Sequence, residues 1–123
     1  MVLEHALLPV RPGREEEFEA AFGRARPLVE ASPGFRSLRL SRCLERPGTY
    51  LLLVEWDRLE DHTEGFRGSV GYREWKALLH SFYDPFPVVE HFTDVVATGD
   101  QAATRRRSAA SIGPDRNSRN IAQ

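Results

Sequence analysis

The segment TYLLLVEW, residues Thr49 to Trp56, is the strongest indication of the fold in the sequence. Its aliphatic and aromatic residues favour a strand, but its four consecutive aliphatic residues do not alternate with polar ones. A strand with one face in water would alternate, so both faces of this strand are expected to be covered. The preceding Arg46-Pro47-Gly48 has Pro and Gly where a type II turn requires them, which predicts a hairpin with a strand over residues 35–45.

Further elements follow on both sides of this hairpin. A strand is predicted over residues 2–10, and a helix over residues 14–31 whose apolar stripe comprises Phe18, Ala21, Phe22, Ala25, Leu28 and Val29. After the hairpin, Asp57-Arg58-Leu59-Glu60 is typical of a helix cap, and the glycines that follow predict a short helix with a break near Ser69. A second helical piece and a strand over residues 88–96 complete the order βαββαβ.

This order predicts a ferredoxin-like α+β fold with a four-stranded antiparallel sheet. Split βαβ connectivity places the first and third strands at the centre of the sheet and the second and fourth at its edges. The helices can cover only one face of such a sheet, whereas the apolar strand over residues 49–56 requires cover on both. A second copy of the same sheet is the simplest cover, so we expect a homodimer formed through the open sheet face.

Charged residues divide the chain into an acidic body and a basic end. Residues 1–96 carry 16 acidic and 12 basic side chains, whereas residues 97–123 carry five arginines and two aspartates. We expect one domain over residues 1–96 and a flexible basic tail over residues 97–123, whose composition cannot offset its ordering entropy. No nucleic-acid binding is expected of an acidic body. A weaker alternative is that Arg105-Arg106-Arg107 docks on an acidic partner or a nucleic acid.

The cellular compartment is inferred from cysteine usage and from the apolar segments. The single cysteine, Cys43, excludes an intramolecular disulfide and favours a reducing cytoplasm. The first ten residues lack the basic lead of a signal peptide. No apolar run approaches the roughly 20 residues that a membrane-spanning helix needs, so no membrane association is expected.

Several kinds of chemistry lack support in the sequence. The histidines and Cys43 show no metal-ligand spacing, so no metal site is expected. Neither a Gly-x-Ser-x-Gly elbow nor a phosphate-binding or dinucleotide-binding glycine loop is present. Val2-Leu3-Glu4-His5 is echoed by Val88-Val89-Glu90-His91, which could place two imidazoles together, although chance similarity between two half-buried strands is the simpler interpretation.

Aromatic residues provide the stronger signal for a binding site. They gather in and around the second helical region, together with two histidines: Trp56, His62, Phe66, Tyr72, Trp75, His80, Phe82, Tyr83 and Phe86. Any one of these side chains is more often part of a core than of a pocket. As a set, their polar groups and the glycines between them favour a concave apolar pocket for a planar organic ligand.

The order of these motifs resembles the antibiotic biosynthesis monooxygenase family of the dimeric α+β barrel superfamily. The resemblance rests on Val10-Arg11-Pro12-Gly13, Glu15-Glu16-Glu17-Phe18, Ser32-Pro33-Gly34-Phe35, the strand ending at Trp56, Leu59-Glu60-Asp61-His62, Phe66, and Tyr72 to Trp75. It implies a homodimer whose sheets pack face to face. It also implies a cofactor-independent oxygenase that acts on a polycyclic phenol or quinol, and Trp56 and His62 match the family pattern best.

Two functions follow as hypotheses. In the first, the chain is a cofactor-free monooxygenase for an aromatic, quinol or polyketide-like molecule. His62 or His80 would then act as base or hydrogen-bond partner, and Trp56, Phe66, Tyr72, Trp75 and Tyr83 would bind the substrate. In the second, it is a non-catalytic dimeric module that binds a small hydrophobic ligand or haem. Family members that degrade haem carry an axial histidine where this chain has Trp75 or Lys76, and an asparagine near Ala6. These differences argue against haem degradation by this chain.

Overall fold

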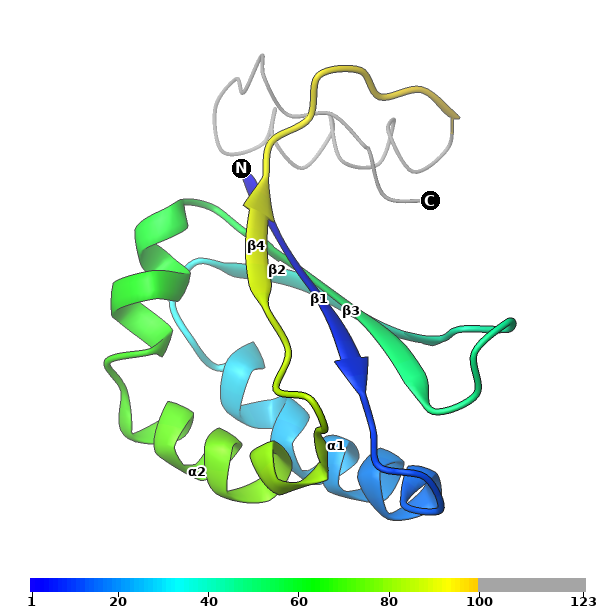
Figure 1. The fold of residues 1–123 in the computed structure, drawn as a ribbon. Coiled ribbons are helices and arrows are strands. Elements are labelled where there is room, and N and C mark those ends of the chain that lie inside the picture. Colours follow the sequence, from blue (N-terminus) through cyan, green and yellow to red (C-terminus); the bar gives the residue numbers. More distant parts are fainter. Residues whose placement is uncertain (100–123) are drawn as a thin grey trace.

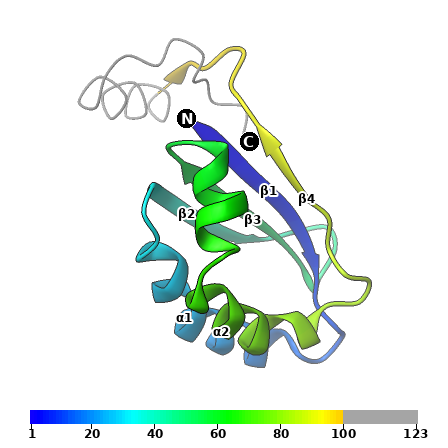
Figure 2. The same ribbon diagram turned by 90° about the vertical axis from the view of Figure 1, so that its left-hand side faces the viewer.

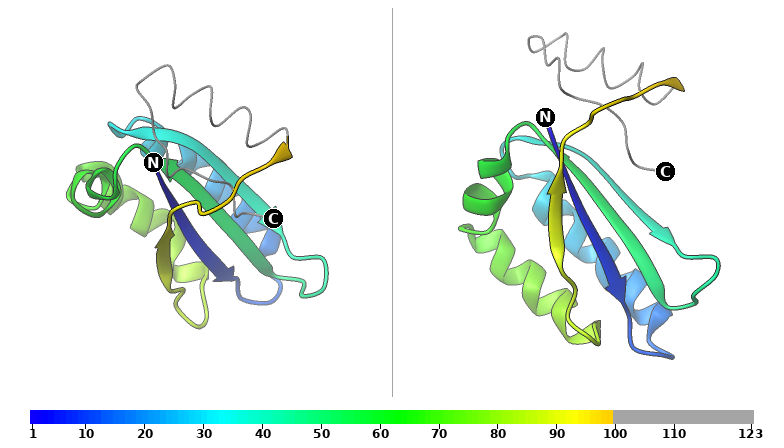
Figure 3. Two further views of the ribbon diagram at one scale, coloured as in Figure 1. Left: turned by 90° about the horizontal axis from the view of Figure 1, so that it is seen from above. Right: turned by 45° about the horizontal axis from the view of Figure 1, so that its top comes forward.

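The structure is a computed structural model that describes residues 1–99. Its elements in chain order are β1 (Val2–Pro9), α1 (Glu15–Glu30), β2 (Phe35–Arg42), β3 (Thr49–Trp56), the π-helix η1 (Asp61–Phe66), α2 (Val70–Leu79), the 3-10 helix η2 (His80–Phe82) and β4 (Val89–Phe92). The sheet has the order β2-β3-β1-β4, with every neighbouring pair antiparallel (Figure 3). The predicted ferredoxin-like α+β fold and the central positions of β1 and β3 are therefore confirmed.

Both long helices pack on one face of the sheet, as Figures 1 and 2 show. The predicted stripe of α1 lies in this interface, where Phe18, Ala21, Phe22, Ala25 and Val29 are buried and Leu28 is partly buried. From β3, the side chains of Tyr50, Leu52, Val54 and Trp56 enter the same core. The type II turn before β3 is confirmed, because Gly48 has a φ of +88° and Thr49 N donates to Arg46 O over 3.1 Å.

The opposite face of the sheet is also apolar, and neither α1 nor α2 packs on it (Figures 1 and 2). By alternation it presents Leu51 and Leu53 from β3, together with Leu3, Leu7 and Phe92 from β1 and β4. Leu7 remains 43% exposed and Phe92 36% exposed. The sheet is open rather than closed into a barrel. Cover of this face by a second copy stays a prediction.

Two strands are shorter than predicted. Strand β2 ends at Arg42 instead of residue 45, and the loop that follows projects Leu44, which is 91% exposed. Strand β4 spans only Val89–Phe92 rather than residues 88–96. It pairs with β1 alone, and its Phe92 is already opposite Leu3, next to the first residue of β1. Beyond Phe92 there is almost no further strand for it to pair with.

The segment after β3 differs from the predicted capped helix. Asp57 does not cap it, because its carboxylate pairs with Arg36 over 2.7 Å. Instead the Asp61 carboxylate accepts from the backbone N of Arg58 over 3.0 Å, and the chain continues as a π-helix. The predicted break is confirmed at Ser69, whose Oγ accepts from Tyr72 N over 3.2 Å and begins α2.

Two remaining predictions concern the end of the chain and membranes. The predicted basic tail lies outside the described residues from residue 100 onward, and so does the hypothesis that Arg105-Arg106-Arg107 docks on a partner. Among residues 1–99, no helix combines the length and the apolar composition needed to cross a bilayer.

Candidate functional site

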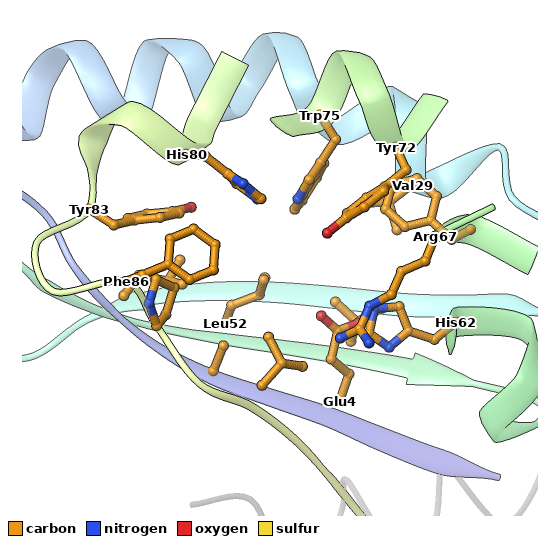
Figure 4. A pocket seen from close by; sticks show the side chains of 16 residues that line it. Glu4, Val29, Leu52, His62, Arg67, Tyr72, Trp75, His80, Tyr83 and Phe86 are labelled. Atoms are coloured by element: carbon orange, nitrogen blue, oxygen red, sulfur yellow. The ribbon is translucent and has the colours of Figure 1, made fainter. Parts of the chain in front are cut away.

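A cavity of about 320 Å³ lies between α2 and the helix-covered face of the sheet (Figure 4). This volume falls in the range of small-molecule binding sites. The floor is formed by β1 and β3, and the roof by α2 and the segments next to it. Its lining comprises Glu4, Ala6, Leu8, Val29, Leu52, Val54, His62, Phe66, Arg67, Tyr72, Trp75, His80, Tyr83, Phe86, Pro87 and Val89.

Six of the seven predicted site residues line this cavity. They are His62, Phe66, Tyr72, Trp75, His80 and Tyr83. The seventh, Trp56, is fully buried and lies behind the wall, where its ring stacks on His62 with centroids 5.4 Å apart. Phe66 joins the roof aromatics, 5.5 Å from Tyr72 and 5.7 Å from Trp75 between ring centroids. The aromatic cluster thus serves both core and cavity.

One end of the cavity is formed by the segment that follows α2. The ring of His80 meets Phe86 edge-on at 4.8 Å and lies 6.2 Å from Tyr83 between centroids. Burial, reinforced by the charge of Lys76, lowers the pKa of His80. Within residues 1–99 the side chain of His80 makes no hydrogen bond, so a neutral imidazole is available to a ligand here. Burial raises the pKa of Tyr83, which keeps this phenol neutral.

A buried carboxyl group occupies the other end, as Figure 4 shows for Glu4, His62 and Arg67. Glu4 belongs to β1 and is only 6% exposed. Its Oε1 accepts from Nε1 of Trp56 over 2.9 Å and lies 3.4 Å from Nε2 of His62. The alternation of β1 and β3 directs Glu4 and Trp56 to the same face of the sheet, which explains why they meet.

His62 is also joined to the edge strand β4. Its Nδ1 lies 2.7 Å from Nε2 of His91, a hydrogen bond in which one ring must donate and the other accept. His91 is the register partner of Glu4, so both residues approach His62 from neighbouring positions of the sheet. The resulting chain of polar contacts runs from Trp56 through Glu4 and His62 to His91.

Burial dominates the electrostatics of this chain. Desolvation raises the pKa of Glu4 from 4.5 to about 7, opposed by the Trp56 hydrogen bond and the positive charge of Arg67. Desolvation lowers the pKa of His62 to about 3, and Arg67 and His91 act in the same direction. The pKa of His91 is lowered by burial and by Arg67. At neutral pH both imidazoles are therefore uncharged, while Glu4 is divided between its acid and carboxylate forms.

The polar contacts join these groups to one another rather than to a common ion. In the part of the chain that the structure describes, no group of three or more His, Cys, Asp or Glu side chains is arranged to hold a metal ion. Both ring nitrogens of His62 face protein atoms, one on Glu4 and one on His91. What this end can do chemically is exchange a proton and hydrogen-bond to a ligand.

Sequence reasoning did not identify Glu4, Arg67 or His91 as site residues. Glu4 and His91 appear in the echo between the first and last strands, but that echo does not bring His5 beside His91. Alternation turns His5 to the open face, where it packs edge-on against Phe92. The signal for Glu4 in the sequence is a charged residue among the apolar residues of the first predicted strand. For Arg67, in the turn between η1 and α2, there was no such signal.

Comparison with known proteins gives a consistent set of relatives. The family model for antibiotic biosynthesis monooxygenases matches residues 1–78. The uncharacterised protein YczJ of Bacillus subtilis is 59% identical over 95 residues, which is 77% of this chain and 100% of YczJ.

Two solved structures extend the comparison. A candidate antibiotic biosynthesis monooxygenase of Bordetella bronchiseptica is 36% identical, with a TM-score of 0.74 and coverage of 77% of this chain and 97% of the other. SnoaB, a cofactor-independent oxygenase of Streptomyces nogalater, is 21% identical, with a TM-score of 0.67 and coverage of 80% and 97%. The likeness to SnoaB concerns the fold alone.

Proposed function

Because this chain belongs to the antibiotic biosynthesis monooxygenase family, we propose that it is a cofactor-independent monooxygenase of an aromatic, quinol or polyketide-like small molecule. The observation that carries the proposal is the aromatic-lined cavity with proton-exchanging groups at both ends. A planar substrate would stack against the roof aromatics, and its hydroxyl or carbonyl groups would meet polar side chains at either end.

The proposed reaction uses the electrons of the substrate itself. An activated CH₂ or phenolic group gives up a proton, and the resulting electron-rich anion reduces O₂. One oxygen atom enters the substrate as a carbonyl and the other leaves as water, so that a CH₂ group and O₂ become C=O and H₂O. The protein's part is to bind the substrate, move protons and exclude bulk water.

We assign the two cavity histidines to opposite ends of the substrate. His80, with no hydrogen bond of its own within residues 1–99, would bond to a substrate hydroxyl. His62 would act through the Glu4 carboxyl that its Nε2 contacts. Phe66, Tyr72, Trp75 and Tyr83 would form the walls, with Trp56 supporting His62 from behind.

Proteins of this family are typically dimeric, and we propose that this one is a cytoplasmic homodimer. The apolar open face of the sheet, with Leu7 and Phe92 partly exposed, supports this interface. The free Cys43 supports a reducing compartment. Size-exclusion chromatography with light scattering should give twice the monomer mass for the wild type, and Leu7→Glu should shift it toward the monomer.

A second candidate function is a dimeric module that binds a small hydrophobic molecule or haem without turnover. The cavity, with aromatic side chains in its roof, favours this alternative as well. A binder would be stabilised by its ligand in a thermal-shift screen, or would change the spectrum of haem, without consuming oxygen.

Oxygen uptake with a panel of hydroquinones, anthrones and naphthols tests the proposal. Wild type should consume O₂ with at least one class, and His80→Gln should lower the rate at least tenfold. His62→Gln should also change the pH dependence of the rate, which a purely structural role would not do. Arg73→Gln, an exposed change on the same helix as the roof, is the matched control. If no compound of the panel causes oxygen uptake, the oxygenase function is rejected and the binding function remains.

A further inference from the structure

Glu4 carries the one carboxyl group in the lining of the cavity, and its two oxygens have different surroundings. Trp56 Nε1 and His62 Nε2 both approach Oε1, at 2.9 Å and 3.4 Å. Within residues 1–99, Oε2 makes no hydrogen bond. The carboxyl group is thus held by one oxygen, and Glu4 is part of the lining of the cavity (Figure 4).

His62 is not free in the same way. Its Nδ1 is bonded to His91 Nε2 over 2.7 Å, and its Nε2 faces Glu4. It can accept a proton from a ligand only by breaking one of these contacts. At this end of the cavity, Glu4 Oε2 is therefore the acceptor that a substrate proton can reach directly.

We propose that Glu4 is the catalytic base of this site, taking a proton from the substrate at Oε2 while Trp56 and the His62–His91 pair hold its Oε1. The inference rests on the proposed oxygenase function and names the residue that moves the proton. The C–H or O–H bond breaks, its electron pair stays on the substrate anion, and Glu4 becomes a neutral acid. Glu4 then returns the proton to the reduced oxygen, so the carboxylate is regenerated.

The surroundings of Glu4 suit this role near neutral pH. From β3 it faces Trp56, from η1 His62, from β4 His91, and from the turn after η1 the guanidinium of Arg67. Burial raises its pKa to about 7, against the lowering effect of Arg67. Because both imidazoles are neutral there, Arg67 is the cation that offsets the carboxylate. Acid and base forms are then both populated, as general acid–base catalysis requires.

Hydrogen exchange at the substrate tests this step apart from oxygenation. The probe is 1,8-dihydroxyanthrone in deuterated buffer without oxygen, and proton NMR follows exchange of its CH₂ group. Wild type should exchange these hydrogens faster than buffer alone, and the pH profile of the rate should show a single ionisation near pH 7. Glu4→Gln should reduce the acceleration at least tenfold. Glu64→Gln, an exposed change on η1, should match wild type. No acceleration by wild type, or full acceleration by Glu4→Gln, would overturn the proposal.

A second measurement needs no substrate. In protein labelled with ¹³C at glutamate side chains, the resonance that disappears in Glu4→Gln should titrate near pH 7, and a midpoint near 4.5 would overturn the assignment. The two proposals fail separately. If wild type takes up oxygen and Glu4→Gln still accelerates hydrogen exchange fully, Glu4 is not the base, and the oxygenase function stands. Exchange that depends on Glu4 without any oxygen uptake supports the base and removes the oxygenase function.

Discussion

Nδ1 of His62 lies 2.7 Å from Nε2 of His91, so the π-helix η1 is tied to the edge strand β4 by a single imidazole–imidazole hydrogen bond. Strand β4 pairs with β1 over only four residues. This bond therefore adds a fixed point to a short edge strand and, at the same time, orients the ring that faces Glu4.

Loss of this bond should loosen β4. We expect His91→Ala to lower the free energy of unfolding by about 1 kcal/mol, because it removes one partly buried hydrogen bond and leaves His62 without its partner. Amide hydrogen exchange of β4 should quicken more than that of β3. Val88→Ala, at an exposed position just before β4, is the control and should change neither quantity. If the amides of β4 are equally protected from exchange in His91→Ala and in wild type, the His62–His91 hydrogen bond does not hold β4 in place.

The stability of Glu4→Gln should depend on pH differently from that of wild type. Because burial raises the pKa of Glu4 from 4.5 to about 7, the folded protein holds this proton more tightly than the unfolded chain. The bound proton of Glu4 therefore adds to the free energy of unfolding. This contribution, about 3 kcal/mol at most, is complete below pH 4.5 and is lost as pH rises toward 7. His62 acts in the opposite sense, since its lowered pKa costs stability as pH falls from 6.5 toward 3.

Wild type and Glu4→Gln both retain His62, so the difference between their free energies of unfolding reports on Glu4 alone. The free energy of unfolding of Glu4→Gln should increase relative to wild type as pH rises from 4.5 to 7. Urea titrations at several pH values measure it, with Glu64→Gln expected to run parallel to wild type. A difference that stays constant over this range would mean that Glu4 ionises normally in the folded protein.

Replacement of Arg67 should raise the pKa of Glu4. The guanidinium lowers the pKa of Glu4, His62 and His91, so Arg67→Met should move all three upward. The midpoint of any Glu4-dependent rate should then shift to higher pH, whereas Arg67→Lys should retain most of the wild-type midpoint. A pH profile of Arg67→Met that coincides with that of wild type would exclude Arg67 from the electrostatics of the site.

Gly34 lies against Asp61, the first residue of η1. It has a φ of +87°, and a Cβ at this position would run into the Asp61 side chain, which accepts from Arg58 N at the start of η1. Gly34→Ala should cost about 1 kcal/mol for the backbone conformation alone, and more for displacing Asp61. Gly13→Ala is the matched control, with a φ of +85° and nothing within 4 Å. Thermal unfolding should show the larger loss for Gly34→Ala, and equal losses would show that Asp61 yields without cost.

The sequence predicts the fold well because its strongest signals are local. The unbroken apolar run of β3 and the turn at Gly48 place a hairpin, and the stripe of α1 faces the sheet as its periodicity requires. Element ends are predicted less accurately: β4 is shorter than predicted because it ends where β1 offers no further partner. The end of β4 is set by its pairing register with β1, and the sequence of β4 alone does not specify that register.

The site was predicted in part for the same reason. Six aromatic or imidazole side chains line the cavity. Only Tyr72 and Trp75 belong to α2, where helical spacing places them on one face, and the others come from η1, from η2 and from the residue after η2. The sequence does not predict that Glu4 and His91 contact His62, because this meeting depends on strand pairing and on the position of His62 in a π-helix. The aromatic type of Trp56 and the family resemblance predict that it binds the substrate, whereas strand alternation and a hydrogen bond to Glu4 place it behind His62.

Oxygen uptake with 1,8-dihydroxyanthrone, with the product measured in the same vessel, tests whether this protein is an oxygenase that uses Glu4 as its base. Wild type should consume one O₂ for each CH₂ group converted to a carbonyl. Glu4→Gln should lose at least tenfold of that rate, and Glu64→Gln should retain it. Wild-type protein that consumes no oxygen above the buffer rate with this probe or the rest of the phenol and quinol panel would contradict the oxygenase function.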